Sequence, residues 1–130
     1  MATTQYLIDT NAAIDYLGEV MPINGLTFMD EIINTNYSIS VISRIELYAF
    51  SKLNPKDKAT LDVFTNQAAL LNINEDIIEK TIELRQTYKT KLPDAIIAAT
   101  ALSYGLTLVT HNQKDFKNIM ELQLVDPYFI

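Results

Sequence analysis

Residues 89–100, KTKLPDAIIAAT, form the stretch of sequence that says most about the fold. Pro93 suits the first position of a helix, because its missing N–H would have no partner there. Asp94 follows it and precedes small and apolar residues. On a helix, Asp94 shares its face with Ile97, Ala98 and Ala101. The stretch predicts a helix that lies close against its neighbours. Its carboxylate either faces the sheet or only complements the helix dipole.

Strand and helix patterns alternate on both sides of this helix. We expect strands at residues 5–9, 37–41, 70–73, 106–110 and 122–126. We expect further helices at 12–17 (capped by Thr10 or Asn11), after Gly25, at 42–53, after Asn54 and Pro55, and after Asn74, with a turn or short helix at 112–116. The alternation predicts an α/β fold with a mainly parallel sheet of four to five strands and helices on both faces.

The composition indicates a single globular domain, because 48% of its 130 residues are hydrophobic and 20% are charged. Cysteine is absent, which excludes disulfides and thiolate metal sites. The first residues, MATTQYLIDT, do not resemble a secretory signal, and no apolar run reaches membrane-spanning length. We therefore expect a soluble cytoplasmic protein. The net charge of −6 argues against nucleic-acid binding unless a bound cation attracts the phosphate.

Three acidic residues stand where a ligand site of a parallel sheet is expected, outside the carboxyl ends of the strands. Asp9 ends the first strand, and Asp94 begins a helix. Glu46 shares a helix face with Ile42, Ile45 and Ala49, where a glutamate is costly unless it is paired or bound to a cation. Three such carboxylates brought together need a cation, and oxygen ligands favour Mg²⁺ or Mn²⁺.

The segment THNQKDF, residues 110–116, adds polar groups after another strand. Thr110 can orient a carboxylate, and either Asn112 or Asp115 can meet a second metal or its water. His111, the only histidine, is given no role. Arg44, Lys89 and Lys91 flank the acidic residues and are candidates for phosphate contact, although ordinary surface charge explains each of them too.

Four motifs together resemble the PIN-domain nucleases, and among them the VapC-type toxins of bacterial toxin–antitoxin systems. They are LIDTN at 7–11, SRIEL at 43–47, KLPDAIIAATAL at 91–102 and LVTHNQKDF at 108–116. The resemblance covers essentially the whole chain, so it implies one PIN-like domain over residues 1–130.

The resemblance also implies a site and an activity. Asp9, Glu46 and Asp94 would be the metal ligands, supported by Asn11 and Thr110. Many family members have a further aspartate where this chain has Asn112, which puts a second metal site in doubt, and Asp115 belongs to a recurring acid–aromatic pair. The implied activity is Mg²⁺-dependent endoribonuclease cleavage of structured RNA such as tRNA. The implied partners are a VapB-like antitoxin and a second copy of the chain.

Two other functions are also compatible with the sequence. One is a Mg²⁺-dependent phosphatase with an aspartyl nucleophile, although Asn11 stands where that chemistry usually wants a second aspartate. The other is a PIN-like binding scaffold with little activity, which Asn112 and the acidic balance suggest.

Overall fold

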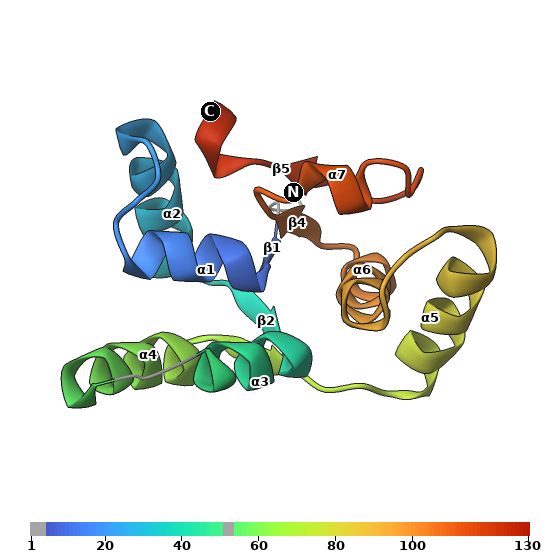
Figure 1. The fold of residues 1–130 in the computed structure, drawn as a ribbon, viewed down its shortest axis with the longest axis horizontal. Coiled ribbons are helices and arrows are strands. Elements are labelled where there is room, and N and C mark those ends of the chain that lie inside the picture. Colours follow the sequence, from blue (N-terminus) through green and yellow to red (C-terminus); the bar gives the residue numbers. More distant parts are fainter. Residues whose placement is uncertain (1–4, 51–53) are drawn as a thin grey trace.

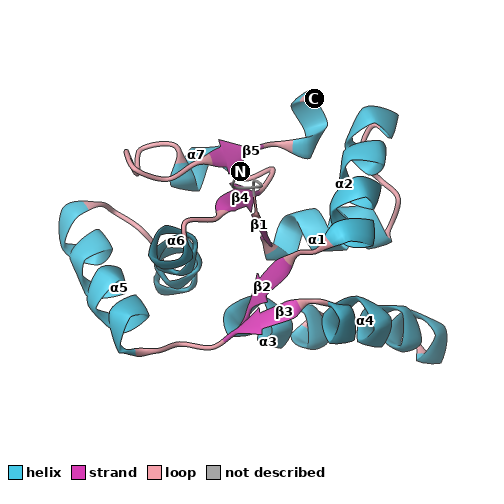
Figure 2. Cartoon of the chain, turned by 180° about the vertical axis from the view of Figure 1, so that it is seen from behind, coloured by secondary structure: helices cyan, strands magenta, loops and turns pink. Residues whose placement is uncertain are grey.

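The structure is a computed structural model that describes residues 5–50 and 54–130. Its strands form one sheet in the order β3-β2-β1-β4-β5, and neighbouring strands always pair in parallel. Figure 1 shows helices on both sides of this sheet, and Figure 2 shows the same arrangement from behind. The predicted α/β fold is therefore confirmed, with five strands.

All the strands are short: β1 (Tyr6–Ile8), β2 (Ser38–Ser40), β3 (Ala69–Leu71), β4 (Thr107–Val109) and β5 (Leu124–Val125). Successive side chains along a strand point to opposite faces of the sheet. Leu7 and Leu108 therefore pack in one apolar core, whereas Ile8 and Val109 pack in a second core on the other face. Because both faces are covered, the central strands carry apolar residues in succession.

The core that contains Ile8 is covered by α1 (Thr10–Leu17), α2 (Ile23–Thr35), α3 (Val41–Ala49) and α4 (Pro55–Gln67). Met29 and Phe64 are buried there. Asn54 caps α4 as expected, because its side chain accepts a hydrogen bond from the backbone N–H of Asp57.

The core that contains Leu7 is covered by α5 (Glu75–Thr87), α6 (Leu92–Tyr104) and α7 (Gln113–Phe116). Asn74 caps α5 through the backbone N–H of Ile77. Gly105 ends α6 in the left-handed conformation, with φ of 65°, which a glycine adopts without a steric penalty. Within the described ranges, no helix combines the length and the apolar character needed to cross a membrane.

The chain ends in a short 3-10 helix, η1 (Pro127–Phe129), which packs against α2. Gly25 is the point of closest approach: a Cβ atom added there would lie 2.2 Å from the carbonyl oxygen of Pro127. Gly25 therefore lies inside α2, where the two backbones meet, and not before the helix as the sequence suggested.

Other expected boundaries were displaced by a few residues. Asp9, and not Thr10 or Asn11, is the N-cap of α1. α6 begins at Leu92, so Pro93 is its second residue. β3 begins one residue earlier than expected and ends at Leu71. α3 ends at Ala49, and residues 51–53 of the helix expected at 42–53 lie outside the described residues.

Candidate active site

Asp9 lies at the carboxyl end of β1 and is buried, with 4% of its surface exposed. Its Oδ1 accepts a hydrogen bond from the backbone N–H of Thr10 at 2.9 Å. Its Oδ2 accepts from Asn11 Nδ2 at 2.9 Å and from Thr110 Oγ1 at 2.8 Å. An ionised carboxylate has about four acceptor positions, so these three bonds fix its orientation and leave room for a cation.

Asn11 and Thr110 therefore both orient Asp9 by donating hydrogen bonds to its carboxylate. Asn11 Nδ2 also approaches Thr110 Oγ1 at 3.1 Å, and Asn11 Oδ1 accepts from the backbone N–H of His111 at 3.0 Å. Both ends of the Asn11 amide are thus occupied in joining α1 to the loop after β4.

Burial raises the pKa of Asp9 from 3.8 to about 6. The hydrogen bonds from Thr110 and Thr10 lower this pKa, whereas the charges of Asp94 and Glu46 raise it further. The carboxylates of Asp94 and Glu46 thus lie close enough to Asp9 to repel its negative charge.

The raised pKa predicts how the stability of the metal-free protein depends on pH. The folded state binds the Asp9 proton more tightly than the unfolded chain does, so this stabilisation is complete below pH 3.8 and is lost as pH rises through about 6. The loss amounts to at most about 3 kcal/mol. We expect urea unfolding in EDTA to show that, between about pH 4 and about pH 7, the free energy of unfolding falls more in the wild type than in Asp9→Asn. Equal pH dependence in the two proteins would contradict the assignment.

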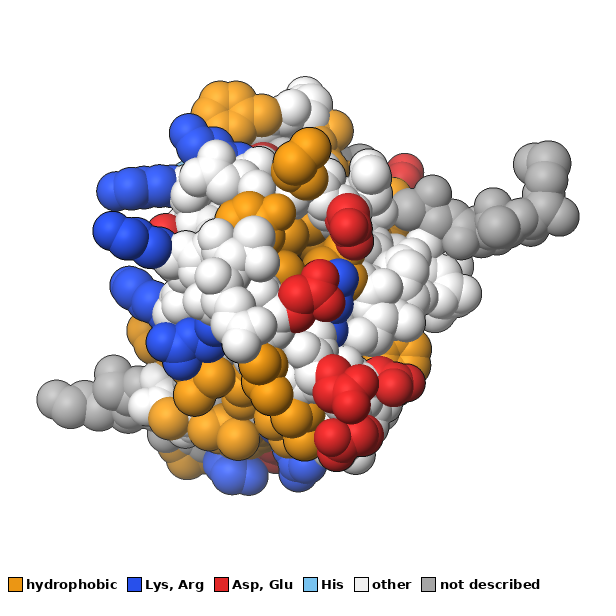
Figure 3. Space-filling view, turned by 90° about the vertical axis from the view of Figure 1, so that its right-hand side faces the viewer, with side chains coloured by type: hydrophobic (Ala, Val, Ile, Leu, Met, Phe, Trp, Pro, Cys, Tyr) orange, Lys and Arg blue, Asp and Glu red, His pale blue; other side chains and the backbone are white. Residues whose placement is uncertain are grey.

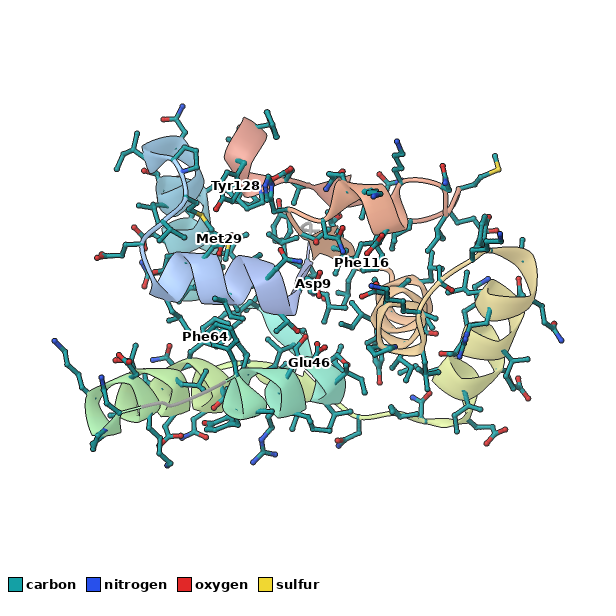
Figure 4. All side chains as sticks on the ribbon, in the orientation of Figure 1. Asp9, Met29, Glu46, Phe64, Phe116 and Tyr128 are labelled. Carbon is teal, nitrogen blue, oxygen red and sulfur yellow. The ribbon has the colours of Figure 1, made fainter. Side chains whose placement is uncertain are left out.

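Glu46 reaches the site from α3. Its Oε1 accepts a hydrogen bond of 2.6 Å from Thr10 Oγ1, which also lies 3.0 Å from Ser43 Oγ. Thr10 and Ser43 therefore contact the candidate site, a role that the sequence did not predict for them; the only signals are a hydroxyl beside Asp9 and a hydroxyl three residues before Glu46. Figure 4 shows Asp9 and Glu46 on facing sides of the space between α1, α3 and α6.

The face of α3 differs from the predicted one. Its buried residues are Ser43 and Leu47, whereas Ile45 is 60% exposed. Glu46 is half-buried next to Leu47. The prediction that Ile45 shares the inward face with Glu46 is therefore wrong, because the buried stripe of α3 runs through Ser43 and Leu47, one turn apart.

Asp94 and Asp115 meet at the N-terminus of α6. Burial, the charge of Asp115 and the charge of Glu46 raise the pKa of Asp94, and the nearby Lys91 lowers it. Asp115 is exposed on α7, and its Oδ2 accepts a hydrogen bond of 2.8 Å from Asn112 Nδ2. Asp115 thus lies near Asp94, and the side chain of Asn112 orients the Asp115 carboxylate.

The basic candidates differ in their position. Lys91 lies beside Asp94, as its effect on the pKa of Asp94 shows, and Lys89 is exposed in the same loop. Arg44 is exposed on α3, where it lines a shallow hollow with Val41, Ile45 and Tyr48.

The acidic residues fit a hard divalent cation. Among the described residues, none of Asp9, Glu46, Asp94 and Asp115 forms an ion pair with a lysine or arginine. In the same part of the chain, no three acidic or histidine side chains are already arranged as a metal cage. Like charges held near one another repel, so a bound cation would relieve this repulsion. Oxygen is the only type of ligand atom that these four residues offer, which suits Mg²⁺ or Mn²⁺.

Fold and site together define a class of protein: an α/β domain with a cluster of carboxylates at the carboxyl edge of its parallel sheet. A sequence model of the PIN domain matches residues 6–122. The chain therefore belongs to the PIN domain family.

Solved structures confirm the resemblance to the VapC-type members. A chain in a toxin–antitoxin complex from Klebsiella pneumoniae is 36% identical, with a TM-score of 0.78, and the match covers 97% of this chain and 100% of that one. A chain of VapBC-1 from nontypeable Haemophilus influenzae is 28% identical, with a TM-score of 0.79, covering 95% and 98%. A chain of VapBC2 from Rickettsia felis, bound to a DNA fragment from their promoter, is 25% identical, with a TM-score of 0.81, covering 95% and 98%. No curated protein is significantly similar in sequence.

Proposed function

We propose that the protein is a Mg²⁺-dependent endoribonuclease that acts as the toxin of a toxin–antitoxin system. The observation that carries the proposal is the mutual influence of four acidic residues from separate elements, named here the acidic cluster (Asp9, Glu46, Asp94 and Asp115). The charges of Asp94 and Glu46 raise the pKa of Asp9, and the charges of Asp115 and Glu46 raise that of Asp94. Within the described residues, no lysine or arginine forms an ion pair with any of them. The full-length similarity to a chain of a toxin–antitoxin complex supports the biological role.

Each acidic residue has a distinct part in this proposal. Asp9, Glu46 and Asp94 would hold the metal ion, and Asp115 would act beside Asp94, where it can bind a second ion or orient a water molecule. The bound ion supplies activation of a water molecule and neutralisation of phosphoryl charge. Thr10, Asn11 and Thr110 keep the Asp9 and Glu46 carboxylates in place through the hydrogen bonds described above.

RNA binding by a chain of net charge −6 needs a local basic surface. Residues 84–91, LRQTYKTK, contain three basic residues and no acidic residue, and they lead directly to the N-terminus of α6. Figure 3 views the side on which α5 lies, and lysine and arginine side chains gather along one edge of it. We propose that Lys89 and Lys91, in the segment that leads to α6, contact the RNA backbone, with Arg44 as a more distant contact. Structured RNA such as tRNA is the proposed substrate class.

Cleavage is expected to require the metal and to leave defined ends. With Mg²⁺ or Mn²⁺ the protein should cut RNA, and with excess EDTA it should not, because the acidic cluster alone repels the phosphodiester. We propose that water attacks the phosphorus while the P–O3′ bond breaks and the 3′-oxygen leaves with a proton, which gives a 5′-phosphate and a 3′-hydroxyl. Mapping the cut ends of a tRNA mixture tests both points. Cleavage in EDTA, or ends that carry a 2′,3′-cyclic phosphate, would contradict the proposal.

The same proposal includes partners. The similar structures are toxin–antitoxin complexes, so we propose a VapB-like antitoxin that places a basic side chain in the acidic cluster and blocks it. We also propose a homodimer, which would bring two basic edges into one assembly. These partners and an RNA substrate imply action in the bacterial cytoplasm.

The contacts of Asn11 weigh against the phosphatase alternative. That chemistry places an acid–base group two residues after the nucleophile, but the Asn11 side chain donates to Asp9 and accepts from the backbone of His111. The binding-scaffold alternative was suggested by Asn112, which stands where many family members have an aspartate. Asn112 donates a hydrogen bond to Asp115, whose charge raises the pKa of Asp94, so a fourth carboxylate is still present near Asp94.

A further inference from the structure

Aromatic residues of the C-terminal segment gather around His111. The His111 and Tyr128 rings are stacked, with centroids 3.8 Å apart and planes inclined by 25°. The Phe129 ring lies 6.4 Å from His111 with planes inclined by 27°. The three side chains are named here the aromatic platform.

Hydrogen bonds fix the inner part of the platform. His111 Nδ1 lies 3.1 Å from both carboxylate oxygens of Asp126, and Asp126 also accepts from the backbone N–H of Tyr128 at 2.9 Å. The Tyr128 hydroxyl donates to Asp15 on α1 at 2.8 Å, and Figure 4 shows Tyr128 above that helix. The stacked pair is thus held at both ends and cannot turn freely.

The outer part of the platform is open to solvent. Phe129 is 83% exposed, and the His111 side chain is 44% exposed although Tyr128 covers one face of its ring. A planar group that lies on the exposed Phe129 ring or on the exposed part of the His111 side chain would extend the stacked pair. Exposed aromatic rings gain little from water, whereas stacking on an unpaired base is favourable for any base.

The platform is also next to the acidic cluster. The backbone N–H of His111 donates to Asn11, which donates to Asp9. His111 directly follows Thr110, whose hydroxyl contacts Asp9, and adjacent Cα atoms are about 3.8 Å apart. A nucleotide beside the cleaved phosphate can therefore reach the platform with its base.

We infer that the platform is a binding subsite for an unpaired RNA base next to the cleaved bond, an inference that rests on the proposed function. The subsite selects single-stranded or looped RNA, because a base paired in a helix cannot leave its stack to lie on His111. It adds affinity that does not depend on phosphate charge, which suits an acidic protein.

RNA binding without cleavage tests the subsite. An Asp94→Asn variant, which should cleave at least a hundredfold more slowly than the wild type, is titrated in Mg²⁺ with a short single-stranded oligouridylate that carries one 2-aminopurine, whose fluorescence falls when the base stacks. In this background Phe129→Ala and His111→Ala should each weaken binding about tenfold and reduce the quenching. His111→Phe keeps a ring and should retain binding. Met120→Ala is the matched control, because Met120 is equally exposed, at 87%, but lies on the loop after α7.

Inorganic polyphosphate, which has charge but no bases, separates stacking from electrostatics. Its binding should be the same in all of these variants. Equal RNA affinity in the parent, Phe129→Ala and His111→Ala proteins would overturn the subsite while leaving the nuclease proposal intact. A parallel loss of RNA and polyphosphate binding would also overturn it. If the parent bound no RNA at all, the proposed function would fall, and this inference with it.

Discussion

Replacing Asp94 with asparagine should lower the rate of RNA cleavage by a hundredfold or more. Replacing a residue that only supports a metal ligand lowers metal affinity or activity roughly 10- to 100-fold. Loss of a ligand carboxylate should therefore lower the cleavage rate at least as much. The asparagine has the same shape and removes a partly buried charge whose pKa is already raised, so the fold should be retained. Initial rates with saturating Mg²⁺, together with thermal unfolding, measure both effects.

Asp76 provides the matched control for this substitution. It is an exposed aspartate in the first turn of α5, as Asp94 is in the first turn of α6, but it lies away from the acidic cluster. Asp76→Asn should cleave RNA at the wild-type rate. Undiminished cleavage by Asp94→Asn would refute the assignment of Asp94 as a metal ligand.

Replacing Gly25 with alanine adds only one methyl group but should cause a large loss of stability. The added Cβ would lie 2.2 Å from the Pro127 carbonyl oxygen, and neither atom can move away unless the backbone that carries it shifts. Either α2 or η1 must shift, at a cost of about 2 kcal/mol or more. Because η1 also carries Tyr128 and Phe129, the shift should displace the aromatic platform as well. Urea unfolding measures the change in the free energy of unfolding.

Gly18→Ala serves as the comparison for Gly25→Ala. Gly18 has an ordinary φ of −85°, and an added Cβ there would lie 3.3 Å from its nearest neighbour, the carbonyl oxygen of Ile14. We expect a change within about 0.5 kcal/mol. If the two variants were equally stable, the close contact between α2 and η1 would not exist in solution.

Gly25 also shows why part of the fold could not be predicted from the sequence. In the sequence it was interpreted as a residue preceding a helix, since glycine usually marks helix ends. The structure shows that glycine is needed there because η1, about a hundred residues later, touches α2 at that point. A contact between distant segments leaves no local pattern.

The acidic cluster was easier to predict than the contacts that orient it. Asp9 and Asp94 were found because strand ends and helix starts are recognisable, and the parallel sheet brings them to one edge. Glu46 was predicted as a site residue, but the buried face of α3 was predicted wrongly. Ile45 was expected to be buried because it is apolar, yet it is exposed. Thr10 was interpreted only as a cap, and its hydrogen bond to Glu46 depends on how two helices meet. His111 was given no role, since a single histidine in a polar turn is usually just exposed. Its stacking partner Tyr128 belongs to the C-terminal segment and leaves no local pattern around His111.

The double task of Asp9 constrains how this chain can evolve. The side chain caps α1 and also lies in the acidic cluster, so replacing it with alanine would cost about 1 kcal/mol of helix stability even if catalysis no longer mattered. A descendant that had abandoned cleavage would therefore still be selected for an oxygen at this position. Glu46 and Asp94 cap no helix. Decay of the enzyme into an inactive relative should be visible at those two positions first.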